Sequence, residues 1–164
     1  MDLDATDLRL LDLLQGDASL SNLELAERAH TSPATALRRV RRLVDAGVID
    51  RRVALLNPHR IGAGRTAVVE ITLDRQGAEH LDAFEQRAAA EVAVQQVWRV
   101  SPGPDFVLVV HSADMAAYHA LVQRLFTQDA NVRNVKAYFS VKRAKFDPRI
   151  DLAAFSLTSR SPAP

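Results

Sequence analysis

The chain has 164 residues, enough for one ordinary domain or two small ones, and 48% of them are hydrophobic, as in proteins that bury a core. It contains no cysteine, which excludes disulfide bridges and thiolate metal sites. No apolar run approaches the roughly 20 residues needed to cross a bilayer, and the acidic N-terminus is unlike a signal peptide. We therefore expect a cytoplasmic protein that makes no membrane contact.

The formal net charge of +1 hides a strong local asymmetry. Residues 1–30 carry seven acidic side chains and two arginines, whereas residues 31–64 carry seven arginines against Asp45 and Asp50. Such an asymmetry indicates a segment that faces a polyanion, and the alternative is an ordinary solvated helix face.

Two helices are predicted before residue 30. The first begins after Asp4, whose carboxylate can cap free N–H groups, and ends at Gly16. The second opens with Ser21 and Glu24, a capping-box pair, and ends near Ala29. The apolar positions that these two helices offer to a core are Leu8, Leu11, Leu14, Leu23, Leu25 and Ala26.

A third, basic helix follows a short turn. Ser32 is a natural N-cap, Pro33 suits the first helical position, and Gly47 can end the helix after Ala46. Helical spacing places Ala36, Val40 and Leu43 on one face with Leu37 and Val44 alongside, Arg38, Arg41, Arg42 and Asp45 on the other side, and Arg39 near the boundary. A short helix, a turn and a basic helix match the helix-turn-helix plan.

The remaining elements alternate between strands and helices. A strand over residues 48–56 completes a winged-helix-like unit, and the later elements are strand 65–73, helix 77–90, strands 92–100 and 106–111, helix 115–126 and strand 132–141. The last six form a ferredoxin-like βαββαβ plan, an antiparallel sheet with two helices on one face. The predicted α+β organisation is a helix-turn-helix domain (1–56), a linker (57–64), a βαββαβ domain (65–152) and a disordered tail (153–164).

The strand over residues 106–111 is apolar on both of its sides. Val107 and Val109 point opposite to Phe106 and Leu108, although two helices can cover only one face. We therefore expect the open face to pack against a second subunit. At about 25 cal/mol per Å² of apolar area, a few hundred Å² would favour a dimer by several kcal/mol.

Several stretches resemble the leucine-responsive/asparagine-regulator (Lrp/AsnC) family. They are residues 3–7 (LDATD), 25–28 (LAER), 32–33 (SP), 38–43 (RRVRRL), 47–49 (GVI), 54–58 (ALLNP), 105–106 (DF) and 132–145. Each stretch alone is weak, but their order and spacing resemble the family over residues 3–152.

The resemblance implies a bacterial transcription regulator that binds double-stranded DNA. It also implies a homodimer built on the C-terminal domain, a further assembly into tetramers or octamers, and an amino acid or related metabolite bound between C-terminal domains. The sequence departs from the family at Arg51-Arg52, where Gly-Tyr is usual, at Lys142-Arg143, where acids are common, and at Pro102, where the effector loop usually has glycine. Proline lacks the backbone N–H that could hold a carboxylate.

The DNA-binding candidates lie in and after the third helix. Ser32, Pro33 and Thr35 open the helix that ordinarily enters the major groove, and Arg38 is the best candidate for reading a guanine together with Thr35. Arg39 and Arg42 are assigned to phosphates, against an alternative of pairing with Asp45 or with the acidic first helix. A further pair, Arg51 and Arg52, either extends the phosphate track or lies on a solvated strand face.

The resemblance places the effector candidates in the loop before residue 106 and on the last strand. They are Ser101, Pro102, Gly103, Asp105, Phe106 and Tyr138. Asp105 would accept an effector's ammonium group, although an aspartate after Gly-Pro is otherwise a turn residue. Tyr138 is otherwise a packed sheet tyrosine.

Neither a metal site nor a catalytic site is indicated. The five histidines have no ligand spacing, and the chain shows neither a phosphate-cradling glycine loop nor a nucleophile–base pair. We expect no enzyme activity and no cofactor. The alternative to an effector-modulated regulator is a DNA-organising protein of the same fold that has lost effector sensing.

Overall fold

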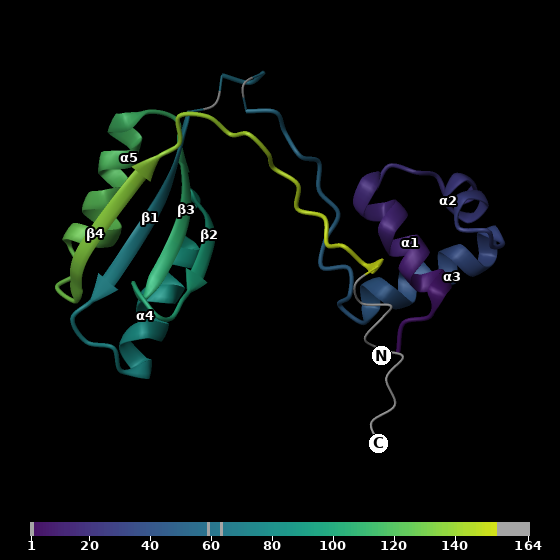
Figure 1. The fold of residues 1–164 in the computed structure, drawn as a ribbon, viewed down its shortest axis with the longest axis horizontal. Coiled ribbons are helices and arrows are strands. Elements are labelled where there is room, and N and C mark those ends of the chain that lie inside the picture. The colour runs from purple at the N-terminus through teal and green to yellow at the C-terminus, as the bar shows by residue number, and fades with distance from the viewer. Residues whose placement is uncertain (1, 59, 63, 154–164) are drawn as a thin grey trace. The chain divides into compact units, whose positions relative to one another are not determined.

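The computed structural model describes residues 2–58, 60–62 and 64–153, in two compact units (Figure 1). The first unit contains the chain up to Leu55 together with the segment that begins at Phe146, and it is called the DNA-binding unit because it holds the predicted helix-turn-helix. The second unit is Leu56–Lys145. The predicted second domain extends to residue 152, whereas the structure groups the residues from Phe146 with the first unit. From residue 154 on, the predicted disordered tail lies outside the described residues.

Three helices form the first unit, and their caps are those predicted. They are α1 (Ala5–Gly16), α2 (Asn22–Arg28) and α3 (Pro33–Asp45). Asp4 caps α1 by accepting the N–H groups of Thr6 and Asp7, both at 2.9 Å. Ser21 and Glu24 form the reciprocal capping box of α2. Gly47 leaves α3 with a φ of +69°, a conformation that favours glycine.

A small apolar core joins the three helices. Its buried members are Leu10, Leu25, Ala26, Ala29, Ala36 and Val40. Leu23, predicted as available to this core, is instead 58% exposed, because on a two-turn helix it projects away from the side that buries Leu25 and Ala26. Leu37 and Val44 are also exposed, since they lie at the edge of the buried face of α3.

The prediction of a strand over residues 48–56 is wrong. Residues 50–57 have no regular secondary structure, and Val53, Leu55 and Leu56 are exposed. A strand needs a neighbour that supplies hydrogen bonds. Among the described residues, the DNA-binding unit contains no other strand with which this segment could pair.

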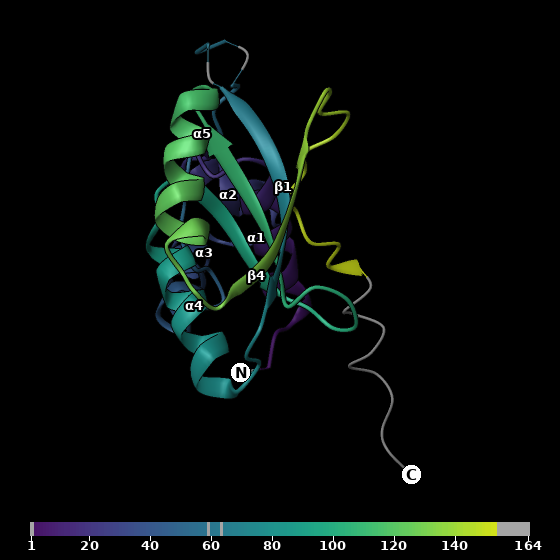
Figure 2. The ribbon, with the colours of Figure 1, turned by 90° about the vertical axis from the view of Figure 1, so that its left-hand side faces the viewer.

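The second unit has the predicted βαββαβ order. Its elements are β1 (Arg65–Leu73), α4 (Ala78–Ala90), β2 (Val94–Arg99), β3 (Phe106–Ser112), α5 (Met115–Val122), the π-helical turn η1 (Gln123–Thr127) and β4 (Val132–Phe139). The sheet order is β2-β3-β1-β4, and all neighbours are antiparallel. Figure 2 shows α4 and α5 on the same side of the sheet. This is the ferredoxin-like plan, with the end of the predicted 115–126 helix wound as a π turn.

The core of this unit lies between the sheet and its two helices. The alternation predicted for β1 is confirmed, since the four residues Ala67, Val69, Ile71 and Leu73 are each at most 1% exposed. Phe84 of α4 packs on Phe106 of β3 with ring centroids 4.9 Å apart. Before β1, Gly64 lies directly against the backbone of Ser112, so a Cβ at this position would overlap the Ser112 carbonyl oxygen.

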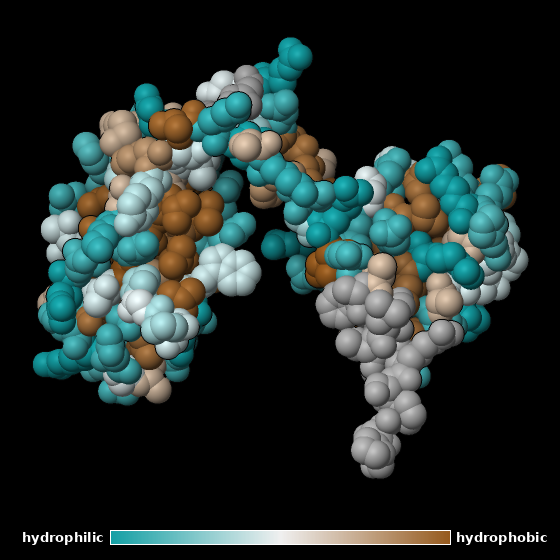
Figure 3. Space-filling view, viewed as in Figure 1, coloured by the Kyte–Doolittle hydropathy of each residue, from teal (hydrophilic) through white to brown (hydrophobic). Residues whose placement is uncertain are grey.

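The face of the sheet that the helices leave open is partly apolar. Cross-strand register places Val68 between Val109 and Tyr138, and Trp98 beside Val107. Trp98 is 57% exposed, Tyr138 53% and Val68 39%. Figure 3 shows apolar side chains gathered over this sheet face, with polar side chains around them.

Candidate nucleic-acid interface and effector loop

The surface of α3 that points away from its core is basic. A shallow groove there is lined by Ala34, Leu37, Arg38, Arg41, Arg42, Asp45 and Ala46. Arg38 and Arg41 are both exposed and lie three residues apart, which places their side chains on the same helix face. This surface therefore presents exposed guanidinium groups, including that of Arg42, beside the carboxylate of Asp45 and apolar side chains.

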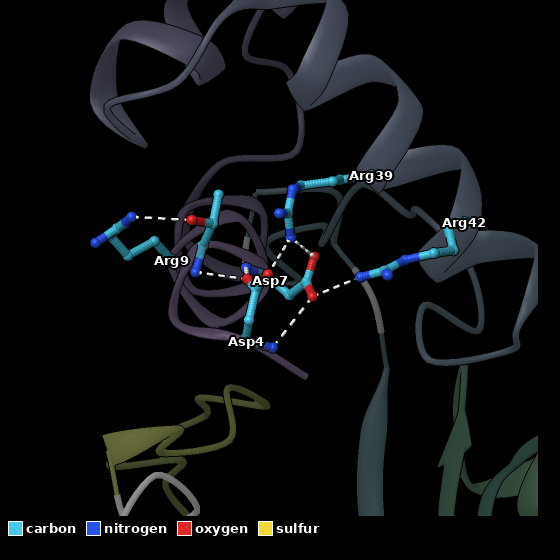
Figure 4. Close-up of polar contacts among 6 residues, drawn as sticks. Asp4, Asp7, Arg9, Arg39 and Arg42 are labelled. Atoms are coloured by element: carbon cyan, nitrogen blue, oxygen red, sulfur yellow. Dashed lines mark hydrogen bonds and ion pairs between the residues drawn. The ribbon is translucent and has the colours of Figure 1, made fainter. Parts of the chain in front are cut away.

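A buried carboxylate on α1 ties α3 to the rest of the unit. Asp7 is fully buried, and its two oxygens accept hydrogen bonds from Arg39 at 2.9 Å and from Arg42 at 2.5 Å (Figure 4). Arg39 also donates to Asp4 at 2.6 Å. We call these four residues the Asp7 clamp. The clamp fixes the basic helix to the capped N-terminus of α1 through charge-assisted hydrogen bonds.

The electrostatics of the Asp7 clamp follow from these contacts. The backbone N–H of Asp7, and next the Arg39 guanidinium, lower the pKa of Asp4 from its usual 3.8 to about 2. Hydrogen bonds to Asp4 and Asp7 in turn raise the pKa of Arg39. Each ionised partner thus favours the charged form of the other.

The Asp7 clamp bears on the roles predicted for its two arginines. The side chain of Arg39 is only 20% exposed and that of Arg42 is 44% exposed. The alternative weighed for both residues, pairing with the acidic first helix, is present in the structure. A phosphate would have to share these guanidinium groups with Asp4 and Asp7.

The other predicted DNA-binding residues lie at the two ends of α3. Ser32 caps the helix by accepting the Thr35 N–H at 3.2 Å, and its hydroxyl lies 2.9 Å from the Thr35 hydroxyl. Pro33 occupies the first turn. Arg51 and Arg52 are exposed beyond the helix, and Arg51 lies 3.3 Å from Asp50.

The prediction missed Arg41 and Leu37 as groove residues, although the three-residue step from Arg38 to Arg41 could have indicated Arg41.

The predicted effector loop is held firmly to the sheet. Asp105 accepts the backbone N–H of Leu73 at 2.7 Å through one carboxylate oxygen, and its own N–H donates to the Ile71 carbonyl at 2.8 Å. The Ser101–Pro102 peptide bond is cis, and Gly103 has a φ of +124°. Asp105 therefore binds the backbone at the end of β1, which is the structural role expected of a turn residue.

The other two effector candidates are strand residues, Phe106 at the start of β3 and Tyr138 on β4. The Phe106 side chain is fully buried against Phe84, so it can offer only its backbone to a ligand at the surface. Tyr138 is exposed opposite Val68, three to five residues along β1 from the contacts of Asp105. At about 3.3 Å per residue, this separation is roughly 10–17 Å within one chain.

Two further observations concern the described part of the chain. It contains no group of three or more histidine, aspartate or glutamate side chains that could hold a metal ion. None of its helices has both the length and the apolar character needed to span a membrane.

A basic, exposed recognition helix in a helix-turn-helix unit, joined to a separate βαββαβ unit, defines a class of two-unit DNA-binding regulators. The comparisons agree with this class. Residues 66–150 match the family profile described as the Lrp/AsnC ligand binding domain, and residues 3–50 match one described as winged helix-turn-helix DNA-binding. The chain belongs to the Lrp/AsnC family of transcriptional regulators.

Named relatives extend over almost the whole chain. The leucine-responsive regulatory protein of Rhizobium meliloti is 36% identical over 88% of this chain and 93% of its own length. That of Escherichia coli K12 is 34% identical over 91% of both chains. Among solved structures, an AsnC family regulator from Agrobacterium tumefaciens is 30% identical with a TM-score of 0.85, covering 93% of this chain and 99% of its own.

A second solved structure was determined with a small molecule. It is a transcriptional regulator from Neisseria meningitidis in complex with L-methionine, 27% identical to this chain with a TM-score of 0.85. The alignment covers 94% of this chain and 99% of that one.

Proposed function

We propose that this regulator works as a homodimer whose two α3 helices read paired DNA half-sites. Its second unit, Leu56–Lys145, is called the ligand-binding unit and responds to an amino acid or related metabolite. The observation that carries the proposal is the groove on α3, where Arg38 and Arg41 stand exposed side by side. The protein acts by binding, without a cofactor or a catalytic step. Its place of action is the cytoplasm, where a bacterial regulator meets the chromosome.

Arg38 and Arg41 are the base-reading residues in this proposal. A guanidinium that donates two hydrogen bonds to guanine is the commonest specific contact in the major groove, worth about 1–3 kcal/mol of discrimination. Ser32, Pro33 and Thr35 bring the N-terminus of α3 to the DNA, where the positive end of the helix dipole favours a phosphate. Arg51 and Arg52, exposed after the helix, extend the contact to the backbone.

The two arginines of the Asp7 clamp take different roles. Arg39 is a positioning residue, because two carboxylates already share its guanidinium and its side chain is 20% exposed. Arg42 is more open, at 44% exposed, and contacts Asp7 through one terminal nitrogen. Arg42 can therefore offer its other N–H groups to a phosphate while it continues to hold Asp7.

The open face of the sheet is the proposed dimer surface. Val68, Trp98 and Tyr138 are exposed there, and burying them removes apolar area from water. Two copies joined in this way would present two recognition helices to one duplex. Tetramers and octamers of such dimers are a further expectation from the family.

The effector site is proposed at the loop over residues 101–105, with Tyr138 contributed by a neighbouring copy. A metabolite bound there would bridge subunits, which overcomes the separation of Asp105 and Tyr138 within one chain. The L-methionine complex of the similar Neisseria meningitidis regulator supports an amino acid as the ligand. One oxygen of Asp105 already accepts the Leu73 N–H, which leaves the other for an ammonium group.

A second candidate function is that of a DNA-organising protein without an effector. It is favoured by Pro102 and Pro104, because each proline removes a backbone N–H from the loop that would hold a carboxylate.

The DNA-binding part is tested by selecting bound genomic fragments and measuring affinity by mobility shift at several salt concentrations. We expect Arg38→Ala to lower affinity roughly tenfold or more and to relax selectivity at a guanine. Arg41→Ala should weaken binding as well. Arg9→Ala, which removes an exposed arginine of α1, is the matched control and should bind like the wild type. Unchanged binding in both α3 variants would contradict the assignment.

The effector part is tested by calorimetry with a panel of amino acids that includes L-methionine and L-leucine. We expect heat of binding from at least one of them and a change in DNA affinity of about 5- to 150-fold, the usual range of allosteric coupling. No heat from any amino acid, with DNA binding intact, would favour the DNA-organising protein instead.

A further inference from the structure

The segment that begins at Phe146 returns to the DNA-binding unit. The side-chain amide of Gln15, on α1, forms two hydrogen bonds with the backbone of Ile150. The Ile150 N–H donates to Gln15 Oε1 at 2.7 Å, and Gln15 Nε2 donates to the Ile150 carbonyl at 3.2 Å. One side chain therefore satisfies both backbone groups of a residue 135 positions away, in the manner of a strand neighbour.

A charged contact stands beside this amide pair. Asp147 accepts hydrogen bonds from the Arg149 Nε at 3.0 Å and from its NH2 group at 2.8 Å. Asp147, and more weakly Asp12, raise the pKa of Arg149. Asp12 precedes Gln15 by three residues on α1, so one side of this helix faces the returning segment at both positions. We call Gln15 and residues 146–152 the C-terminal clasp.

The C-terminal clasp changes how the two units are connected. The chain passes between them twice, once at Leu55–Leu56 and again at Lys145–Phe146. The second passage follows directly from β4, the strand that carries Tyr138. Helix α1 receives this passage near its C-terminal end, and near its N-terminal end it holds α3 through the Asp7 clamp. A unit attached by two segments has fewer accessible positions than a unit attached by one.

We propose that the C-terminal clasp is a second tether that restricts the DNA-binding unit and thereby determines which half-site spacings a dimer accepts. The proposal rests on the dimeric DNA-binding function proposed above. Once one DNA-binding unit of a dimer is bound, the affinity of the dimer for the whole site depends on how often the second unit reaches its own half-site. A restrained unit favours one spacing, whereas a freely swinging unit tolerates several.

Two substitutions of Gln15 in the full-length protein form a graded test. Gln15→Glu keeps the acceptor for the Ile150 N–H but loses the donor, and Gln15→Met keeps the length but loses both hydrogen bonds. Gln86→Met, at an exposed glutamine of α4 in the other unit, is the matched control. In the absence of DNA, the hydrogen exchange of a peptide over residues 146–153 reports whether this segment is docked on Gln15.

At about fivefold per hydrogen bond, we expect this exchange to rise at least about fivefold in Gln15→Glu and about 25-fold in Gln15→Met. The control should keep the wild-type exchange. Wild-type exchange in Gln15→Met would overturn the C-terminal clasp itself.

The second readout is affinity for duplexes whose two half-sites are moved apart one base pair at a time. We expect the wild type and the control to prefer one spacing by about tenfold over a spacing shifted by half a helical turn. Gln15→Met should lose most of this preference. An unchanged preference in Gln15→Met, despite faster exchange, would overturn the tether. A wild type that shows no DNA binding would instead refute the proposed function, while the exchange result still judges the clasp.

Discussion

The DNA-binding unit and the ligand-binding unit are held together in different ways. Among its described residues the first buries eight apolar side chains, three of them alanine, and it also joins α3 to α1 through the carboxylate of Asp7. The second has a core of thirteen buried apolar residues that includes Phe84, Phe106 and Phe126. A buried charge therefore helps to position α3 in the first unit, whereas side-chain volume positions the sheet of the second.

This difference has a consequence for the recognition helix. The arginines that make α3 basic also anchor it, since Arg39 and Arg42 both contact Asp7. Screening by salt acts little on a buried carboxylate but strongly on exposed charges. Removing the Asp7 carboxylate should thus destabilise the first unit, and removing core volume should destabilise the second. Four changes, from the largest expected effect to the smallest, test how each unit is held together.

Phe84→Ala should destabilise the ligand-binding unit by about 3–5 kcal/mol, because it leaves a cavity beside Phe106 and removes a fully buried ring. The unfolding transition of this unit in a calorimetric scan would move to lower temperature. The transition of the DNA-binding unit should keep its midpoint. A loss below about 1 kcal/mol would mean that volume does not govern this core.

Asp7→Ala should destabilise the DNA-binding unit by about 3 kcal/mol, since it leaves two arginines without their buried partner. Chemical denaturation, monitored by the hydrogen exchange of peptides from α1 and α3, would measure the loss of stability. Glu27→Ala, an exposed acid on α2, is the control and should change stability little. An equal loss in both variants would argue against a special role of the Asp7 clamp.

Asp105→Ala should cost about 1–3 kcal/mol in the ligand-binding unit, because the Leu73 N–H loses its acceptor. Asp105→Asn retains an acceptor oxygen and should recover most of this stability. The unfolding free energy of the two variants measures this structural role. Amino-acid calorimetry on the same variants measures the proposed ligand contact separately. Full stability of Asp105→Ala would show that the contact with Leu73 is dispensable.

The smallest expected effect is a loss of folded-state stability at acid pH. The pKa of Asp4 is lowered to about 2, chiefly by the Asp7 backbone N–H and then by Arg39, so its ionised form stabilises the folded state above about pH 4. This contribution should disappear as the pH falls from about 4 to about 2. A carbon-detected NMR titration of the Asp4 carboxyl checks the pKa, and a midpoint near 3.8 would contradict the contact. Asp4→Asn should flatten that part of the stability profile.

Local features of the fold were readable from the sequence, and pairings between distant segments were not. Asp4, Ser21 and Ser32 cap helices through groups two or three residues away, so spacing alone predicts them. The strand over residues 48–56 was predicted wrongly, because the segment has β-forming residues but no neighbour among the described residues of its unit.

The candidate site divides in the same way. The basic face of α3 follows from helical periodicity, which also contained the information for Arg41. The charge pattern indicated pairing of Arg42 with the acidic first helix as an alternative, but it did not identify Asp7, 35 positions away, as the partner. The contact of Gln15 with Ile150 spans 135 positions, and no local pattern indicates it. Only the packing of α1 reveals that some arginines of α3 hold the helix in place.

The most direct measurement is site-specific photo-crosslinking to a selected DNA fragment. A photoreactive side chain at Ala34, in the groove beside Arg38, should form crosslinks to the duplex, and these should disappear as salt rises. The same group at Gln86, on α4 of the other unit, should form none. Crosslinks from residue 86 with none from residue 34 would contradict the assignment of α3 as the DNA-reading surface.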